Sequence, residues 1–195
     1  ERNRLNGTVL RWIDIEAKRT IPFEVIAREV SHEWEMHGMS LSFKVDRVDQ
    51  LPNGGRVIID YKSKTSNSLG DWTRTPIQAP QLPCYSEVID DVVAVAVASV
   101  ASEKPGYRPI GAAMGVRSDA AAQKEMDEKA GLTWDELQCQ WRDELDRLVA
   151  DFIRGSVVAT LSAKACRYCD YTAICRAKVQ DSADDGEDAD LTAYD

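Results

Sequence analysis

The chain lacks the features that mark membrane and secreted proteins. Its longest apolar run, VVAVAVASVA at 92–101, has ten residues, about half of the roughly 20 that a bilayer-spanning helix needs. The run therefore predicts a buried strand. No basic segment followed by an apolar one opens the sequence, so we expect a cytoplasmic rather than a secreted protein.

Cysteine is scarce, and internal repeats are absent from the sequence. There are five cysteines, of which Cys166, Cys169 and Cys175 form one C-x2-C-x5-C cluster. Such an arrangement, without a leader, argues against a framework of disulfides. It favours thiolate ligation of a metal in a reducing compartment.

The sequence also has no excess of basic charge, since its net charge is −9. Seven of the 33 acids lie at 181–195, a stretch without Lys or Arg, which leaves 24 basic against 26 acidic residues in the first 180. We expect the tail, 179–195, to be disordered. The nearly neutral body weakens an interpretation as a nucleic-acid-binding protein, unless bound cations offset some of the acids.

The order of periodic segments predicts an α/β domain with a mixed central β-sheet flanked by helices. Strands are expected at 23–35, on both sides of the turn at 52–55, and at 92–101 and 109–116; helices are expected at 5–18, 79–90 and 134–154. Leu5, Val9, Trp12 and Ile13 give the first helix an apolar stripe. The last helix has a capping box, Thr133 with Glu136, and an apolar stripe of Leu137, Trp141, Leu145, Leu148, Phe152 and Ile153.

The segment FKVDRVDQLPNGGRVIIDYKSK at 43–64 carries the chemistry. Asp60 and Lys62 lie two apart on one strand and must share a face, and the hairpin can bring Asp46 beside them. Two carboxylates and an ammonium group at the end of an apolar sheet are costly to bury unless a divalent cation lies between the carboxylates. The alternative is a cross-strand ion pair at a sheet edge. Asp49 competes with Asp46 for the ligand position.

The sequence VDRVD followed by IIDYKSK resembles the motifs of the PD-(D/E)XK nuclease superfamily, in particular those of its RecB/AddB branch. QLPCY at 81–85 matches the Gln-x-x-x-Tyr element of that branch, and the C-x2-C-x5-C cluster resembles the cysteines that close an AddB-type iron-sulfur nuclease domain. The resemblance implies a restriction-endonuclease-like core at 1–162, a cysteine segment at 163–178 and the acidic tail at 179–195. It also indicates the C-terminal part of a longer protein.

By the same resemblance, Asp46 and Asp60, with the backbone carbonyl of Tyr61, would bind Mg2+ or Mn2+. Lys62 would orient or deprotonate the attacking water. Gln81 and Tyr85 would position the lysine or the DNA backbone. Cys166, Cys169 and Cys175 would hold a structural 4Fe-4S cluster.

The chain departs from the branch in two places. A His or Glu on an upstream helix usually adds a metal ligand there, and here only Glu16 and Glu29 are available substitutes, because His32 and His37 lie in a polar stretch and are expected to be exposed. The fourth cysteine is missing unless Cys84 or Cys139 supplies it, and both are expected in the core. Zinc, or no metal at all, therefore stays open as an alternative for the cysteine cluster.

We therefore expect a Mg2+-dependent DNA nuclease, an exonuclease acting in DNA repair and recombination, that works with DNA and a helicase subunit or domain. The alternative is a nuclease-fold module that binds DNA or a partner without cutting, which the missing ligand and the neutral body favour. A small cysteine-metal interaction domain is a third interpretation.

Overall fold

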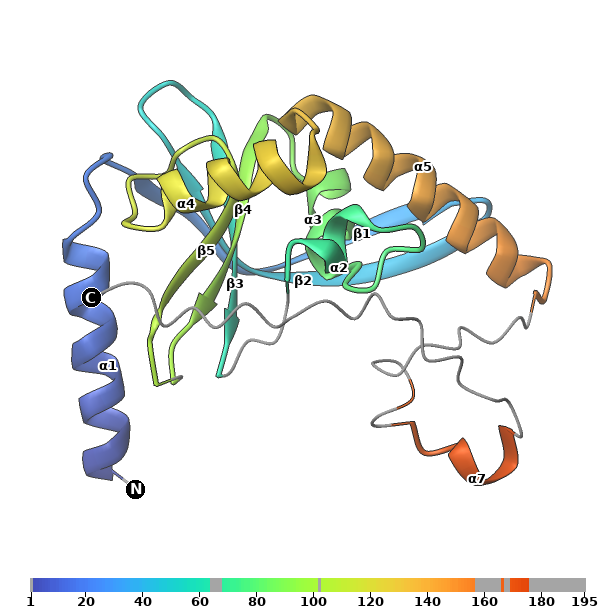
Figure 1. The fold of residues 1–195 in the computed structure, drawn as a ribbon, viewed down its shortest axis with the longest axis horizontal. Helices are drawn as coiled ribbons and strands as arrows, with labels where there is room; N and C mark the ends of the chain where they lie inside the picture. Colours follow the sequence, from blue (N-terminus) through green and yellow to red (C-terminus); the bar gives the residue numbers. More distant parts are fainter. Residues whose placement is uncertain (1, 64–67, 102, 157–165, 167–168, 176–195) are drawn as a thin grey trace. The chain divides into compact units, whose positions relative to one another are not determined.

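A mixed sheet of five strands forms the centre of the computed structural model (Figure 1), which describes residues 2–63, 68–101, 103–156, 166 and 169–175. The strands are β1 (Glu24–Met36), β2 (Met39–Gln50), β3 (Arg56–Lys62), β4 (Val92–Ser99) and β5 (Gly106–Gly111), and they lie in that order across the sheet. Only the β3–β4 pair is parallel; the other neighbours are antiparallel. The predicted fold class, a mixed sheet flanked by helices, is confirmed.

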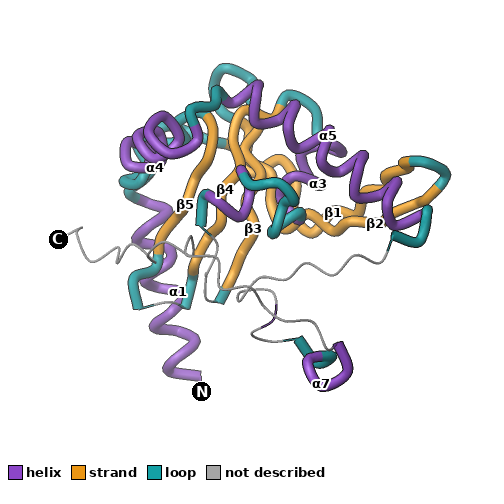
Figure 2. The backbone as a smooth tube through the Cα atoms, turned by 45° about the vertical axis from the view of Figure 1, so that its right-hand side comes forward, coloured by secondary structure: helices purple, strands orange, loops and turns teal. Residues whose placement is uncertain are grey.

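Helices cover one face of the sheet along most of its width (Figures 1 and 2). They are α2 (Gly70–Thr73), α3 (Gln81–Val88), α4 (Asp119–Glu125), the π-helical turn η1 (Met126–Ala130) and α5 (Trp134–Ile153). The core beneath them joins Ile58 of β3 and Val95 of β4 to Trp72, Leu82 and Trp141. Because Trp72 is only 1% exposed, it belongs to this core.

The opposite face is covered by α1 (Arg2–Ala17) and the segment that follows it. Val57 and Ile59 of β3 and the alanines of β4 form this second core, against which Trp12 and Ile15 pack. Both faces of β3 and β4 are therefore buried, which explains their nearly continuous apolar sequences.

Two tight turns fix the registers of the antiparallel strands. His37 and Gly38 both have positive φ, 51° and 76°, which suits a two-residue turn between twisted strands. The β1–β2 register runs from Met36↔Met39 to Glu24↔Gln50. In the second hairpin the Asn53 side chain accepts the Gly55 N–H at 3.0 Å and closes the turn into β3.

Several predicted details need correction. In α1 the buried residues expected at Leu5, Val9 and Ile13 are 53–55% exposed. The strand expected at 109–116 is β5, Gly106–Gly111, and the periodic pattern does not predict α4. The capping box is confirmed, because Glu136 Oε2 accepts the Thr133 N–H at 2.8 Å. In the apolar stripe of α5, Leu137, Trp141 and Leu145 are buried, whereas Phe152 and Ile153 are 72% and 50% exposed.

The chain divides into two compact units, Glu1–Asp151 and Phe152–Asp195. The described part of the second unit contains the short helix α7 (Thr172–Cys175). Among the described residues, no helix is both long and apolar enough to cross a membrane.

Gly111 provides a test of packing between β5 and α5. Its φ is +106°, and an added Cβ would lie 2.5 Å from the Val93 carbonyl oxygen and 2.8 Å from the Trp134 ring. Gly111→Ala should therefore destabilise the protein by about 1–3 kcal/mol more than Gly131→Ala, because Gly131 also has a positive φ but has nothing within 4 Å of an added Cβ. Urea unfolding of the two variants measures the difference, and equal losses would contradict the packing described here.

Candidate active site

The end of β3 presents a buried acid and a lysine on one face. Asp60 is 2% exposed, and the Lys62 Nζ lies 2.9 Å from its Oδ2. Both side chains follow Ile58 on the helix-covered side of the sheet, as strand alternation requires. Burial raises the pKa of Asp60 above its ordinary value of 3.8, while the hydrogen bond from Lys62 lowers it. The carboxylate is thus held in a position where its charge is only partly compensated.

Asp46 approaches the same strand end from β2. The paired positions of β2 and β3 end at Arg47↔Ile59, and next to this point the Asp46 Oδ2 accepts the Tyr61 N–H at 2.8 Å. The negative charge of Asp46 also raises the pKa of Asp60, as expected for two neighbouring like charges. Asp46 and Asp60 therefore lie close to each other, as the sequence predicted.

A chain of hydrogen bonds links Lys62 to α3. The Lys62 Nζ donates to Gln81 Oε1 at 2.7 Å, and Gln81 Nε2 donates to the Tyr85 hydroxyl at 2.7 Å. The Tyr85 hydroxyl in turn donates to the Lys44 carbonyl oxygen at 2.9 Å. Burial raises the pKa of Tyr85, so the phenol stays protonated and able to donate. The Gln-x-x-x-Tyr element thereby fixes the lysine to both α3 and β2.

The donor atoms at this strand end suit a small, hard cation. Asp46 and Asp60 provide carboxylate oxygens, and Tyr61, between Asp60 and Lys62, provides a backbone carbonyl. Mg2+ and Mn2+ prefer such oxygen ligands, and a divalent cation would compensate the buried charge of Asp60 as well as its repulsion from Asp46. Within the described ranges, no group of three or more His, Cys, Asp or Glu side chains is gathered around one possible metal position.

Asp49, the competing candidate, lies on the opposite face and is fully buried. The Arg47 Nε and the Arg19 Nη1 each donate to it at 2.6 Å. Its two oxygens are therefore already bonded to guanidinium groups. Of the two acids in VDRVD, only Asp46 faces the Tyr61 backbone at the end of β3.

Glu16, one proposed substitute for the upstream ligand, lies in the same network on that opposite face. It accepts hydrogen bonds from the Arg47 Nη1 at 2.8 Å and from the Tyr107 hydroxyl. Burial and this bond raise the pKa of Tyr107. Glu16 is thus committed to joining α1 to the sheet.

Glu29, the other substitute, lies on β1 next to Asp46 in the register. The pairs Arg28↔Arg47 and Val30↔Val45 leave Glu29 and Asp46 facing each other between them. Glu29 has a φ of +54°, an uncommon conformation for a residue with a side chain, and its carboxylate pairs with the Lys44 ammonium group. The irregular backbone therefore brings a third carboxylate to the strand position opposite Asp46.

The two histidines differ from each other. His37 is exposed, as expected, and its Nε2 lies 2.8 Å from Asp146 Oδ1 on α5. His32 was expected to be exposed but is half-buried, and its Nε2 has no hydrogen-bond partner among the described atoms. The reason is that His32 shares one face of β1 with Trp34 and Met36, which are also half-buried, so a polar-looking stretch still has an inner face.

The cysteines are all free thiols. Cys84 is in the core, as predicted, and burial raises its pKa to about 11, whereas Cys139 is exposed, contrary to the prediction. Cys166 and Cys169 are half-buried and Cys175 is exposed. Much of the predicted segment 163–178 and all of the tail 179–195 lie outside the described residues, so the iron-sulfur cluster stays a prediction.

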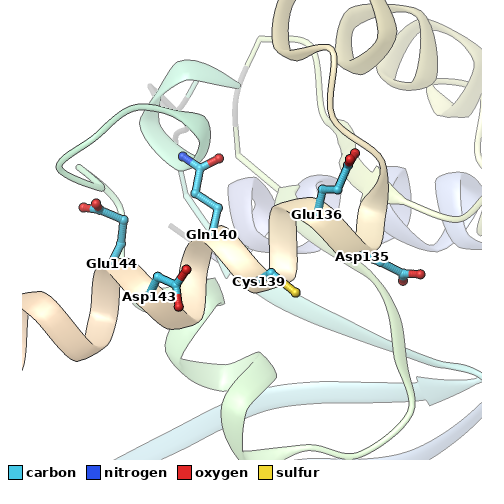
Figure 3. A pocket seen from close by; sticks show the side chains of 6 residues that line it. All are labelled: Asp135, Glu136, Cys139, Gln140, Asp143 and Glu144. Atoms are coloured by element: carbon cyan, nitrogen blue, oxygen red, sulfur yellow. The ribbon is translucent and has the colours of Figure 1, made fainter.

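An open hollow on α5 is separate from this site (Figure 3). The residues that line it are Asp135, Glu136, Cys139, Gln140, Asp143 and Glu144. Glu136 serves the capping box, and Glu144 accepts from the Arg147 Nη2 at 2.8 Å. The hollow is acidic and would repel phosphate groups, so we do not assign it to nucleic acid.

A comparison with protein-family models agrees with the sequence motifs. The model of the PD-(D/E)XK nuclease superfamily matches residues 1–176. The chain is similar to the crystal structure of SSO0001, with 16% sequence identity and a TM-score of 0.43 over 90% of this chain and 71% of that one. Comparison with curated proteins gave no match.

The raised pKa of Asp60 leads to a prediction about stability. Because the folded protein holds the Asp60 proton more tightly than the unfolded chain does, its stability falls as pH rises through the unfolded and then the folded pKa. Without metal, Asp60→Asn should therefore be more stable than the native protein at pH 7, and the difference should shrink toward pH 4.

Urea unfolding in the presence of a chelator measures this difference at both pH values. Asp143→Asn, an exposed acid on α5, is the matched control and should change stability by less than about 0.5 kcal/mol. A loss of stability in Asp60→Asn at pH 7 would show that the Lys62 bond outweighs the burial of the charge.

Proposed function

Because the chain belongs to the PD-(D/E)XK nuclease superfamily, we propose that it hydrolyses phosphodiester bonds of DNA with Mg2+ or Mn2+ held by Asp46 and Asp60. The observation that supports this most directly is the connected set from Asp60 through Lys62 and Gln81 to Tyr85, adjacent to Asp46. This set brings acid, base and positioning groups to one strand end.

Phosphodiester hydrolysis needs charge neutralisation at the phosphoryl oxygens, a positioned water and help for the leaving oxygen. The first of these is the chemistry that a divalent cation supplies when bound. Asp46 and Asp60 would hold this cation, and the Asp46 bond to the Tyr61 N–H joins β2 to β3 next to them.

Lys62 is the residue placed to act on water or on developing charge. Its side chain is 36% exposed, and Asp60 and Gln81 restrain its ammonium group from two sides. A lysine restrained in this way can orient a water or stabilise the phosphorane-like charge without a large loss of side-chain freedom.

Glu29 is the acid that we propose as the third ligand, in place of the His or Glu that an upstream helix usually supplies. Its position opposite Asp46 in the β1–β2 register supports this role, and Glu16 is engaged on the other face. To serve, the Glu29 carboxylate would exchange its exposed pairing with Lys44 for the cation, a small change because such exposed pairs contribute little.

We further propose an exonuclease that works with a helicase subunit or domain in DNA repair. The motifs VDRVD, IIDYKSK and QLPCY of the RecB/AddB-type resemblance support this assignment. A structural iron-sulfur cluster at Cys166, Cys169 and Cys175 is part of the same proposal.

The first test compares single substitutions at the proposed centre. Asp46→Asn, Asp60→Asn and Lys62→Met should each lower cleavage of linear DNA in Mn2+ by at least about 100-fold, and the two Asp variants should lose saturable Mn2+ binding in calorimetry. Asp143→Asn is the control and should behave like the native protein. Native protein that binds DNA and leaves it intact with either cation would favour the alternative of a binding module.

The second test addresses the α3 connection. Gln81→Ala removes the acceptor of the Lys62 bond, so kcat should fall by about 10- to 100-fold with little change in Mn2+ affinity. Gln78→Ala changes an exposed glutamine just before α3 and should keep native kcat. Equal cleavage rates in the two variants would argue against a positioning role for Gln81.

A further inference from the structure

A buried ionic network lies on the face of the sheet opposite the proposed metal ligands. It consists of Arg19, Arg47, Asp49 and Glu16, two positive and two negative groups, together with the hydroxyls of Tyr61 and Tyr107. Arg47 is at its centre. Its Nε and Nη2 hold the two Asp49 oxygens at 2.6 and 3.0 Å, and its Nη1 donates to Glu16 at 2.8 Å.

The same Nη1 of Arg47 also donates to the Tyr61 hydroxyl at 2.8 Å. Tyr61 lies between Asp60 and Lys62, and alternation directs its ring to the reverse face while its neighbours point forward. The Tyr61 ring also packs edge-on against Trp12 of α1, with centroids 5.7 Å apart. The network thus reaches the strand end that carries the proposed active site.

Tyr61 is consequently held by two adjacent residues of β2 from opposite sides. Asp46 accepts its backbone N–H on one side, and Arg47 donates to its phenol on the other. The regular pairing of the two strands ends at Arg47↔Ile59, so these two side-chain bonds join β2 to β3 beyond that point.

We propose that Arg47 and the Tyr61 hydroxyl are positioning residues, which act through the sheet to fix the end of β3 and thereby the geometry of the Asp46 and Asp60 metal ligands. The proposal rests on the proposed function for its metal. Groups that orient metal ligands without touching the metal typically change metal affinity by about 10- to 100-fold when removed.

The network contains its own matched control. Arg19 holds the same Asp49 carboxylate, at 2.6 Å, and its Nη1 lies 3.8 Å from the Glu16 carboxylate. In the described part of the chain, the hydrogen bonds of its side chain go to Asp49 and the Met114 carbonyl. A lysine cannot reproduce the forked guanidinium contacts. Arg47→Lys and Arg19→Lys should therefore both lower the melting temperature, whereas only Arg47→Lys breaks the link to Tyr61.

The experiment measures two quantities for the native protein, Tyr61→Phe, Arg47→Lys and Arg19→Lys. The first is hydrogen exchange of the Tyr61 amide in metal-free protein, and the second is the calorimetric Kd for Mn2+. We expect about tenfold faster exchange and about tenfold weaker Mn2+ binding in Tyr61→Phe and Arg47→Lys. Arg19→Lys should stay within about twofold of the native protein in both.

The proposal is overturned if Tyr61→Phe keeps both the native exchange rate of the amide at residue 61 and the native Mn2+ affinity. It is also overturned if Arg19→Lys changes both quantities as much as Arg47→Lys does. A native protein without saturable Mn2+ binding would overturn the proposed function instead. In that case the exchange of the Tyr61 amide still decides whether Arg47 fixes the end of β3, because that measurement uses no metal.

Discussion

The arrangement of the site depends on the burial of one carboxylate, Asp60, next to a second one, Asp46, on the same side of a sheet. Asp60 is almost fully buried, and its pKa is raised mainly by this burial and further by the charge of Asp46. Left free, two such groups would separate or one would take up a proton. The structure prevents separation by bonding Asp46 to the Tyr61 backbone, and it offsets the charge of Asp60 only partly, through Lys62.

The free-energy cost of this partly compensated charge is offset by the packing of the rest of the fold rather than by contacts within the site. The parallel pair β3–β4 is buried on both faces, with Ile58 and Val95 in one core and Ile59 and Ala96 in the other. A strand anchored over its length in this way can carry a charged end. The same reasoning explains why the site lies at the end of β3, where the β2–β3 pairing stops and side chains become available.

The sequence predicted the parts of the site that follow from short, regular spacings. Asp60 and Lys62 share a face because strands alternate, and Gln81 and Tyr85 meet because residues four apart on a helix are neighbours. Choosing between Asp46 and Asp49 needed the family resemblance. Because the two acids are three residues apart on a strand, alternation places them on opposite faces but does not say which face carries the site. Glu16 could not be placed, because the apolar stripe of α1 misidentified its buried side and only Trp12 among the four stripe residues packs on the sheet.

Arg47 shows what the sequence signal missed and where it could have been found. A charged residue beside two acids suggests a solvated ion pair, yet Arg47 is 9% exposed. The apolar runs of β3 and β4 already indicate a sheet covered on both faces, so any polar side chain directed to the reverse face must be buried and paired. Tyr61 lies on that face by alternation, which makes it an available partner. The motif D-R-V-D thus serves both faces of the sheet. Asp46 lies on the face of the proposed metal site, whereas Arg47 and Asp49 lie on the opposite face, in the network that holds the end of β3.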